Sequence, residues 1–173
     1  PPMTDPLPTA PTPHARWQGR HLEVEVIFSY AGIATQILLT AGKQHLLLDC
    51  GDGTTRDLLG LDSRNLAGIA ISHGHYDHLG GLWSLLGCLR TIGRKGKITI
   101  VSPPGCVELD TILEGFEQHY RSTCPYTIVR QTPAPGEEVE LGPFRIRPFP
   151  VVHADSILLG QEEFSAIPAY GYS

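Results

Sequence analysis

Three features that would place this chain in a broad class are missing from its sequence. No apolar run reaches the length of about 20 residues that a membrane-spanning helix needs. No Lys/Arg cluster marks a nucleic-acid-binding surface, and no basic segment followed by an apolar core marks a secretory signal. The formal net charge is −5 over 173 residues. We therefore expect a cytoplasmic protein that does not span a membrane and does not bind nucleic acid mainly through charge.

The cysteines are widely spaced and include no CxxC pair. They are Cys50, Cys88, Cys106 and Cys124. Without a secretory signal, scattered cysteines are typical of reduced thiols and not of a disulfide framework. Hydrophobic residues make up 41% of the chain and charged residues 18%, which favours a folded domain over a disordered one.

A proline-rich segment precedes the part of the chain with regular patterning. Six of the first 13 residues are proline, so we expect a disordered tail over residues 1–20 and one domain over 21–173. Alternating and short apolar runs predict strands at 22–26, 34–40, 44–49, 66–71, 97–101, 126–131, 137–141 and 144–152. Helical spacing and N-cap chemistry predict helices at 56–61, 80–90 and 109–120. The fold class expected from this order is α/β with a mixed sheet.

Four residues of metal-ligand type lie on one loop between a predicted strand and a predicted helix. The loop reads Ser-His-Gly-His-Tyr-Asp-His-Leu-Gly-Gly over 72–81. His73 and His75 are two residues apart, so on an extended backbone they point to the same side and can bind one cation. Asp77 and His78 follow the turn and can face a second cation. Imidazole and carboxylate together suit zinc, and also manganese or iron. The alternative is a polar surface loop that happens to contain three histidines.

This HxHxDH loop resembles the signature of the metallo-β-lactamase superfamily of metal-dependent hydrolases. The resemblance implies a four-layer αββα sandwich. The strand that ends at Asp49, followed by Cys-Gly-Asp-Gly-Thr, is similar to the superfamily's first motif, which implies that Asp49 hydrogen-bonds the metal loop and does not bind metal. His153 stands where the superfamily places its third-motif histidine, which implies a three-histidine site with His73 and His75. The alternatives are a turn or capping role for Asp49 and an exposed loop position for His153.

Three further segments resemble the ribonuclease Z branch of phosphodiesterases. They are residues 49–56, 100–105 and 168–172. The resemblance implies hydrolysis of phosphodiesters by a metal-activated hydroxide, with Asp77 as a catalytic residue that orients the hydroxide or takes its proton. The branch carries a later aspartate and a final histidine beyond its Gly-Tyr, which is Gly171-Tyr172 here. We therefore expect a chain that holds the N-terminal two-thirds of the hydrolase and lacks its C-terminal part, with one well-bound zinc and a second, weaker site.

The sequence leaves several alternatives open. The substrate can be a phosphodiester or another small ester. RNA is a third candidate, but the acidic balance does not favour it. The chain can also be a non-catalytic, truncated metal-binding module, or a metallo-hydrolase of lactams, lactones or thioesters. A homodimer is neither indicated nor excluded. Ser72 and Tyr76 are candidates for shaping the metal loop, and packing or solvent contact explains them equally well.

Overall fold

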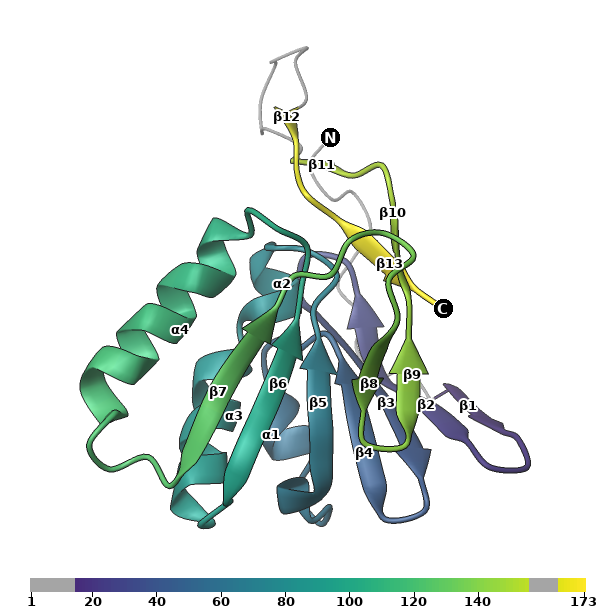
Figure 1. Cartoon of the computed structure of the whole chain (residues 1–173). Coiled ribbons are helices and arrows are strands. Elements are labelled where there is room, and N and C mark those ends of the chain that lie inside the picture. The colour runs from purple at the N-terminus through teal and green to yellow at the C-terminus, as the bar shows by residue number, and fades with distance from the viewer. Residues whose placement is uncertain (1–14, 156–164) are drawn as a thin grey trace.

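A seven-stranded mixed sheet forms the centre of the protein. A computed structural model describes residues 15–155 and 165–173. The strands follow one another in chain order across the sheet (Figure 1). They are β1 (Ala15–Gln18), β2 (Glu23–Tyr30), β3 (Ala34–Ala41), β4 (Gln44–Leu48), β5 (Leu66–Ala70), β6 (Gly96–Val101) and β7 (Tyr126–Gln131). The strands β1 to β4 pair antiparallel, and β4 to β7 pair parallel. The mixed sheet predicted from the sequence is confirmed.

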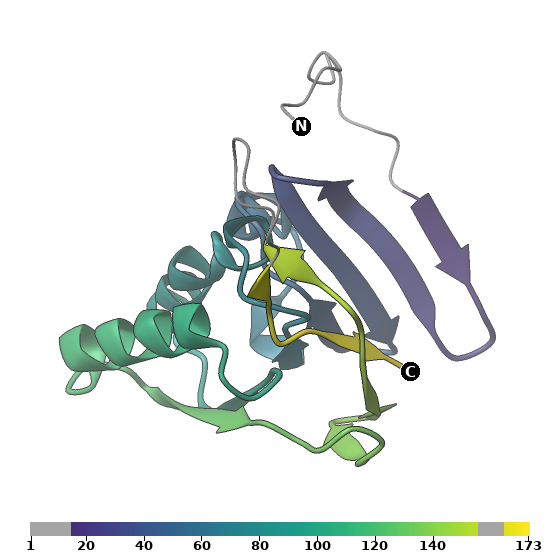
Figure 2. The same ribbon diagram turned by 90° about the horizontal axis from the view of Figure 1, so that it is seen from above.

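The helices cover one face of this sheet (Figures 1 and 2). They are α1 (Thr54–Asp57), α2 (Tyr76–Leu79), α3 (Leu82–Thr91) and α4 (Val107–Tyr120), with a 3₁₀ turn at Ser63–Asn65. The leucines of α3 recur at helical spacing and are almost fully buried, and α4 adds Leu109 and Phe116. These side chains pack against the apolar residues of β4, β5 and β6 to form the larger core. At about 25 cal/mol per Å² of buried apolar surface, this core is the main source of stability.

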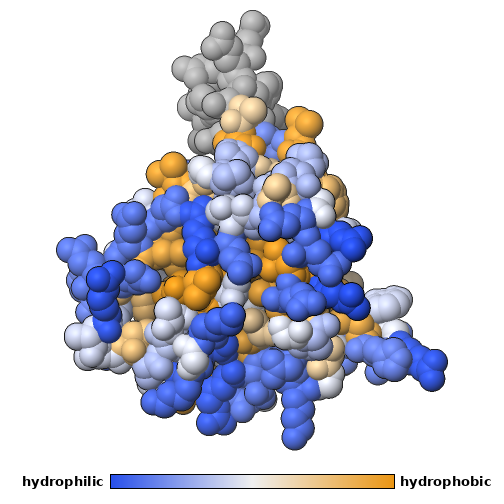
Figure 3. All heavy atoms as spheres, viewed as in Figure 1, coloured by the Kyte–Doolittle hydropathy of each residue, from blue (hydrophilic) through white to orange (hydrophobic). Residues whose placement is uncertain are grey.

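Short strand pairs lie on the opposite face of the sheet. The hairpin of β8 (Val139–Leu141) and β9 (Phe144–Ile146) packs its apolar side chains against those of β4, β5 and β6, which forms a second core. Next come β10 (Pro148–Pro150), which pairs with β13 (Tyr170–Tyr172), and β11 (Ala154–Asp155), which pairs with β12 (Ser165–Ala166). Apolar side chains remain visible among hydrophilic ones on this face (Figure 3).

Several expectations from the sequence differ from the structure in detail; the strand expected at 22–26, for example, continues to Tyr30 as β2. Ala15–Gln18 form β1 inside the segment expected to be a tail, because they pair with residues 23–26 of β2; residues 1–14 lie outside the described part of the chain. The strand expected at 144–152 is divided into β9 and β10, because residues 144–146 pair with β8 and residues 148–150 pair with β13. The helix expected at 56–61 is the short α1, whose N-cap Gly53 provides no side-chain cap.

Two negative expectations can be compared with the structure. All four cysteines lie within the described residues, and none of them is paired in a disulfide there. Among the described residues, no helix has the length and apolar character needed to cross a membrane.

Candidate metal centre

The candidate ligands lie at the carboxyl ends of the parallel strands β4 and β5. The chain leaves β4 at Asp49, whose N–H donates to the carbonyl of Ala70 at 2.9 Å. It leaves β5 at Ile71, whose N–H donates to the carbonyl of Val101 at 2.8 Å. In open α/β sheets, binding sites form beyond the carboxyl ends of the strands. The sheet thereby places the metal loop at the edge where polar groups can converge.

His73, His75 and His153 meet in one cluster. His73 Nε2 lies 3.1 Å from His75 Nδ1, and His153 Nε2 lies 3.3 Å from the same atom. One ring nitrogen from each residue falls within 4.8 Å of the other two. Zinc with four tetrahedral ligands at about 2.0–2.1 Å requires ligand nitrogens about 3.3 Å apart. The three imidazoles therefore match zinc in chemistry and in spacing, although His153 is 78 residues away from His75 in the chain.

The environment keeps His73 in the neutral form that binds metals. Burial, together with the smaller effects of the neighbouring His78, His153 and His75, lowers the pKa of His73 to about 3. Its side chain is almost completely hidden from solvent, with 7% of the residue exposed. Metal ligation requires unprotonated imidazole, so the ring does not have to lose a proton at neutral pH before it binds.

Asp49 lies beside the histidine cluster and organises the loop. Its Oδ1 accepts the backbone N–H of Ser72 at 2.7 Å, and its Oδ2 accepts the Ser72 hydroxyl at 2.8 Å. The same Oδ2 lies 2.8 Å from His78 Nδ1. Asp49 has φ 58°, and among the described residues it is the one non-glycine residue with positive φ. Aspartate tolerates this conformation better than most residues, and backbone strain of this kind is typical of functional sites.

The hydrogen bonds of Ser72 and Asp49 determine which imidazole nitrogens carry protons. A carboxylate only accepts, so the single Ser72 hydroxyl proton points to Asp49. Ser72 Oγ therefore accepts from His73 Nδ1, which lies 2.9 Å away. His78 Nδ1 donates to Asp49 by the same argument. In their neutral forms both rings therefore carry the lone pair on Nε2, the tautomer needed for ligation through that atom.

Asp77 and His78 form a second group next to the three histidines. Asp77 Oδ2 lies 3.6 Å from His78 Nε2, and Asp77 is buried, with 6% of its surface exposed. The same Oδ2 accepts the backbone N–H of Gly32 at 2.8 Å. Burial acts to lower the pKa of His78, but the hydrogen bond and charge of Asp49 and the charge of Asp77 raise it overall. This pair can provide one nitrogen and one oxygen ligand to a second cation.

Several contacts that hold the loop were not predicted from the sequence. Tyr172 donates its hydroxyl to the carbonyl of Ile71 at 2.7 Å. The Tyr170 N–H donates to the carbonyl of Ser72 at 2.8 Å. The resemblance had marked residues 168–172 as a motif without assigning them a role, so this motif was the available signal for the two contacts. No sequence signal pointed to Gly32.

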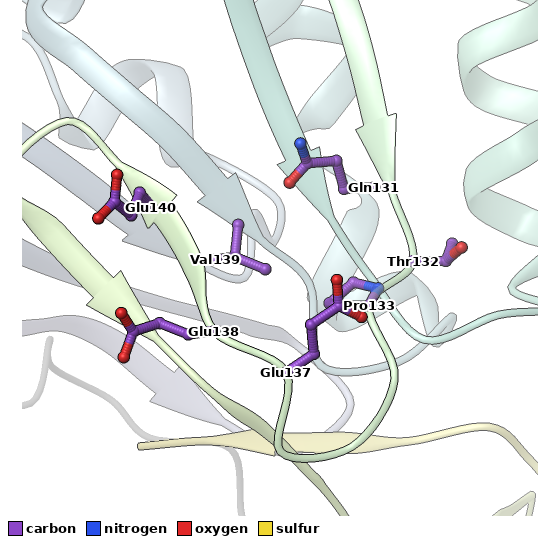
Figure 4. Close-up of a pocket in the computed structure, with 7 residues that line it drawn as sticks. All are labelled: Gln131, Thr132, Pro133, Glu137, Glu138, Val139 and Glu140. Atoms are coloured by element: carbon purple, nitrogen blue, oxygen red, sulfur yellow. The ribbon is translucent and has the colours of Figure 1, made fainter.

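The hollow drawn in Figure 4 lies away from these ligands. It has a volume of about 380 Å³ and is lined by Gln131, Thr132, Pro133, Glu137, Glu138, Val139 and Glu140. Two of its three carboxylates already have partners: Glu137 accepts the N–H of Ala134, and Glu138 pairs with Arg147 at 2.7 Å. None of the predicted metal ligands lines it. The hollow is therefore separate from the histidine cluster.

Comparison with known proteins identifies relatives of the whole arrangement. The family model of the anti-Pycsar protein Apyc1 matches residues 26–158. The ribonuclease Z of Bradyrhizobium sp. (strain ORS 278) is 34% identical over 129 residues, which are 73% of this chain and 42% of that protein. The ribonuclease Z of Archaeoglobus fulgidus is 32% identical over 119 residues, which are 68% of this chain and 38% of that protein.

Solved structures share the fold at lower identity. The short form of human tRNase Z superposes with a TM-score of 0.66 at 20% identity, over 86% of this chain and 63% of that one. The metallo-β-lactamase fold protein YhfI of Bacillus subtilis gives a TM-score of 0.64 at 20% identity, over 87% of this chain and 56% of that one. The predicted αββα metallo-β-lactamase fold is confirmed.

The chain spans about 42% of the length of the first of these ribonuclease Z relatives. The family match, in contrast, covers most of the chain itself and includes the metal loop and His153. The chain therefore belongs to the anti-Pycsar protein Apyc1 family and is a ribonuclease Z-like member of the metallo-β-lactamase superfamily.

Proposed function

We propose that the protein is a metal-dependent hydrolase of phosphodiesters. The observation that carries this proposal is the convergence of His73, His75 and His153 on one point with zinc-compatible spacing. The names of the ribonuclease Z relatives support the phosphodiester class of substrate. Zinc is the preferred cation, with manganese or iron as alternatives that the same ligand types accept.

In this proposal each residue near the cluster has a separate task. His73, His75 and His153 hold the first cation, and Asp77 and His78 supply ligands to the second. A divalent cation bound there supplies Lewis-acid polarisation of a phosphoryl oxygen and lowers the pKa of a coordinated water towards neutrality. Asp77 orients the attacking water and accepts its proton, since its buried carboxylate is fixed by the Gly32 N–H. Asp49 binds no cation and holds His78 and Ser72 in place.

The charge of the chain bears on the proposed substrate. The sequence contains 13 Lys and Arg residues and 18 Asp and Glu residues. Binding of a long RNA backbone draws on many Lys and Arg contacts. A small phosphodiester fits this balance better than a long RNA, and RNA remains the alternative within the same reaction class.

Metal content and turnover test the proposal together. Protein purified without chelators should contain close to one zinc per chain, measured by mass spectrometry of metals, and should hydrolyse an aryl phosphodiester. The His75→Ala variant should lose both properties. The matched control is His119→Ala, which removes an exposed imidazole on α4. Metal content near zero in the unsubstituted protein, or unchanged turnover in His75→Ala, would contradict the proposal.

A non-catalytic metal-binding module is the second candidate. It is favoured by the small number of ligands at the second site. Among the described residues, Asp77 and His78 are the two candidate ligands that we assign to it. One bound zinc without turnover on any ester would support this candidate. Turnover of lactams, lactones or thioesters in place of phosphodiesters would identify a different hydrolase on the same site.

A further inference from the structure

The turn between β2 and β3 reaches across to the metal loop. The turn is closed by the Ile33 N–H, which donates to the carbonyl of Tyr30 at 3.0 Å. At its tip, the Gly32 N–H donates to Asp77 Oδ2 at 2.8 Å, and the Gly32 carbonyl accepts the Tyr76 hydroxyl at 2.6 Å. Both backbone polar groups of one residue are therefore bound by two consecutive residues of a loop about 45 positions away.

The contact from Gly32 determines which lone pairs of Asp77 are available. Asp77 Oδ2 faces His78 Nε2 at 3.6 Å and accepts the Gly32 N–H. An oxygen of a carboxylate has two lone-pair sites, so one backbone donor occupies one of them and leaves the other free. The bond also fixes the rotation of the carboxylate, which is otherwise a broad torsion. Gly32 thereby holds Asp77 in one orientation towards the space next to His78.

Tyr76 secures the turn from outside the core. Its residue surface is 69% exposed, so packing does not explain its position. The interaction that ties Tyr76 to the turn is the hydrogen bond from its hydroxyl to the Gly32 carbonyl. Gly32 itself has φ 75°, a conformation that favours glycine. The hydroxyl bond therefore stabilises the turn geometry in which the Gly32 N–H points at Asp77.

We propose that the Tyr76–Gly32 contact is a positioning device for the second cation site. Tyr76 and Gly32 are positioning residues, which act through Asp77 and touch neither substrate nor cation. The inference rests on the proposed function in one respect, since it takes Asp77 and His78 as ligands of a second cation. It goes further because it gives the β2–β3 turn, which is remote in sequence, a role in the affinity of the second cation site. The turn has no such role at the three-histidine site.

The test removes the Tyr76 hydroxyl alone. Zinc is titrated into the Tyr76→Phe variant, and binding is followed by two-dimensional NMR of backbone amides, with the Gly32 signal as reporter of the second step. The matched control is Tyr30→Phe on the same turn, because no hydrogen bond of the Tyr30 hydroxyl is found among the described residues. Amide hydrogen exchange of Gly32 in the metal-free protein gives a readout that needs no cation.

We expect Tyr76→Phe to weaken the second binding step by about tenfold, the loss typical of one hydrogen bond, and to leave the first step unchanged. Gly32 exchange should become faster in the same variant, and Tyr30→Phe should resemble the unsubstituted protein in all three measurements. Unchanged second-step affinity in Tyr76→Phe overturns the inference, as does an equal loss in both steps. Absence of zinc binding in the unsubstituted protein is a different result, because it contradicts the proposed function, and the inference with it.

Discussion

Asp49 Oδ2 and His78 Nδ1 lie 2.8 Å apart, and this contact links the end of β4 to the loop that follows β5. The same carboxylate accepts the hydroxyl and the backbone N–H of Ser72. Three donors from the metal loop thus share one buried side chain that is itself outside the histidine cluster. Because parallel strands end at the same edge of the sheet, the β4–β5 pairing brings these groups together. The sheet geometry therefore determines the orientation of the imidazoles.

Asp49→Asn should destabilise the fold. The amide NH₂ replaces an acceptor oxygen where three donors converge, and hydrogen bonds to a charged group are worth about 1.5–3 kcal/mol each. We expect a loss of about 2 kcal/mol in the free energy of unfolding, measured from urea midpoints at constant slope. Asparagine accepts the positive φ of this position, so backbone strain does not contribute. The matched control is Asp52→Asn, an exposed residue three positions later. Equal midpoints for the two variants would contradict the role of Asp49.

The sequence predicted most of the elements because their patterns are local. Helical spacing located α3 and α4, and apolar runs located the strands β3 to β7 within about two residues at each end. The metal loop was located by residue chemistry, since His73 and His75 follow a buried strand. His153 was assigned through resemblance to a known family, and the structure brings it to His75.

The contacts made by turns could not be predicted, because they depend on how distant segments pack. Nothing local to Gly32 indicates that its N–H reaches Asp77, 45 residues later. The role of Ser72 was left open between loop shaping and solvent contact, and its bonds to Asp49 and His73 resolve this in favour of loop shaping. The β1 strand was also missed, because Ala15–Gln18 have no buried side chain that would give a pattern.

The buried cysteines should resist modification in the folded protein. Cys50 and Cys106 are buried, whereas Cys88 and Cys124 are partly exposed. Burial raises the pKa of Cys50 to about 12 and raises that of Cys106, and the thiolate is the reactive form. A thiol reagent at pH 8 should label Cys88 and Cys124 first, and peptide mass spectrometry identifies the sites. Labelling of Cys50 at the rate of Cys88 under native conditions would contradict the buried position.

The lowered pKa of His73 should destabilise the metal-free protein in acid. The pKa of His73 falls from its ordinary value of 6.5 to about 3 in the folded state. Between these values the unfolded chain binds a proton that the folded chain does not, so the free energy of unfolding decreases as the pH falls from 6.5. The raised pKa of His78 acts in the opposite sense, and its contribution is lost as the pH rises through the folded-state value.

The His73→Asn variant separates this effect from other titrations. Unfolding free energies measured with a chelator present, between pH 7 and pH 4, should depend less steeply on pH in this variant than in the unsubstituted protein. His119→Asn, which changes an exposed residue on α4, should keep the original slope. An unchanged slope in His73→Asn would show that His73 titrates alike in the folded and unfolded states.

Two glycines near and in α3 should respond oppositely to alanine. At Gly81, the N-cap of α3, an added Cβ would lie 2.2 Å from the carbonyl oxygen of Gly51, a backbone atom that cannot move aside without shifting the loop after β4. Gly87 lies inside α3, and apart from the backbone of its own helix no atom of the described residues lies within 4 Å of such a Cβ. We therefore expect Gly81→Ala to lower the free energy of unfolding by about 1–3 kcal/mol through overpacking. Gly87→Ala should raise it by about 0.5–1 kcal/mol, because alanine is the better helix former. Urea unfolding measures both variants, and a neutral Gly81→Ala would show that the loops after β4 and β5 are not in close backbone contact.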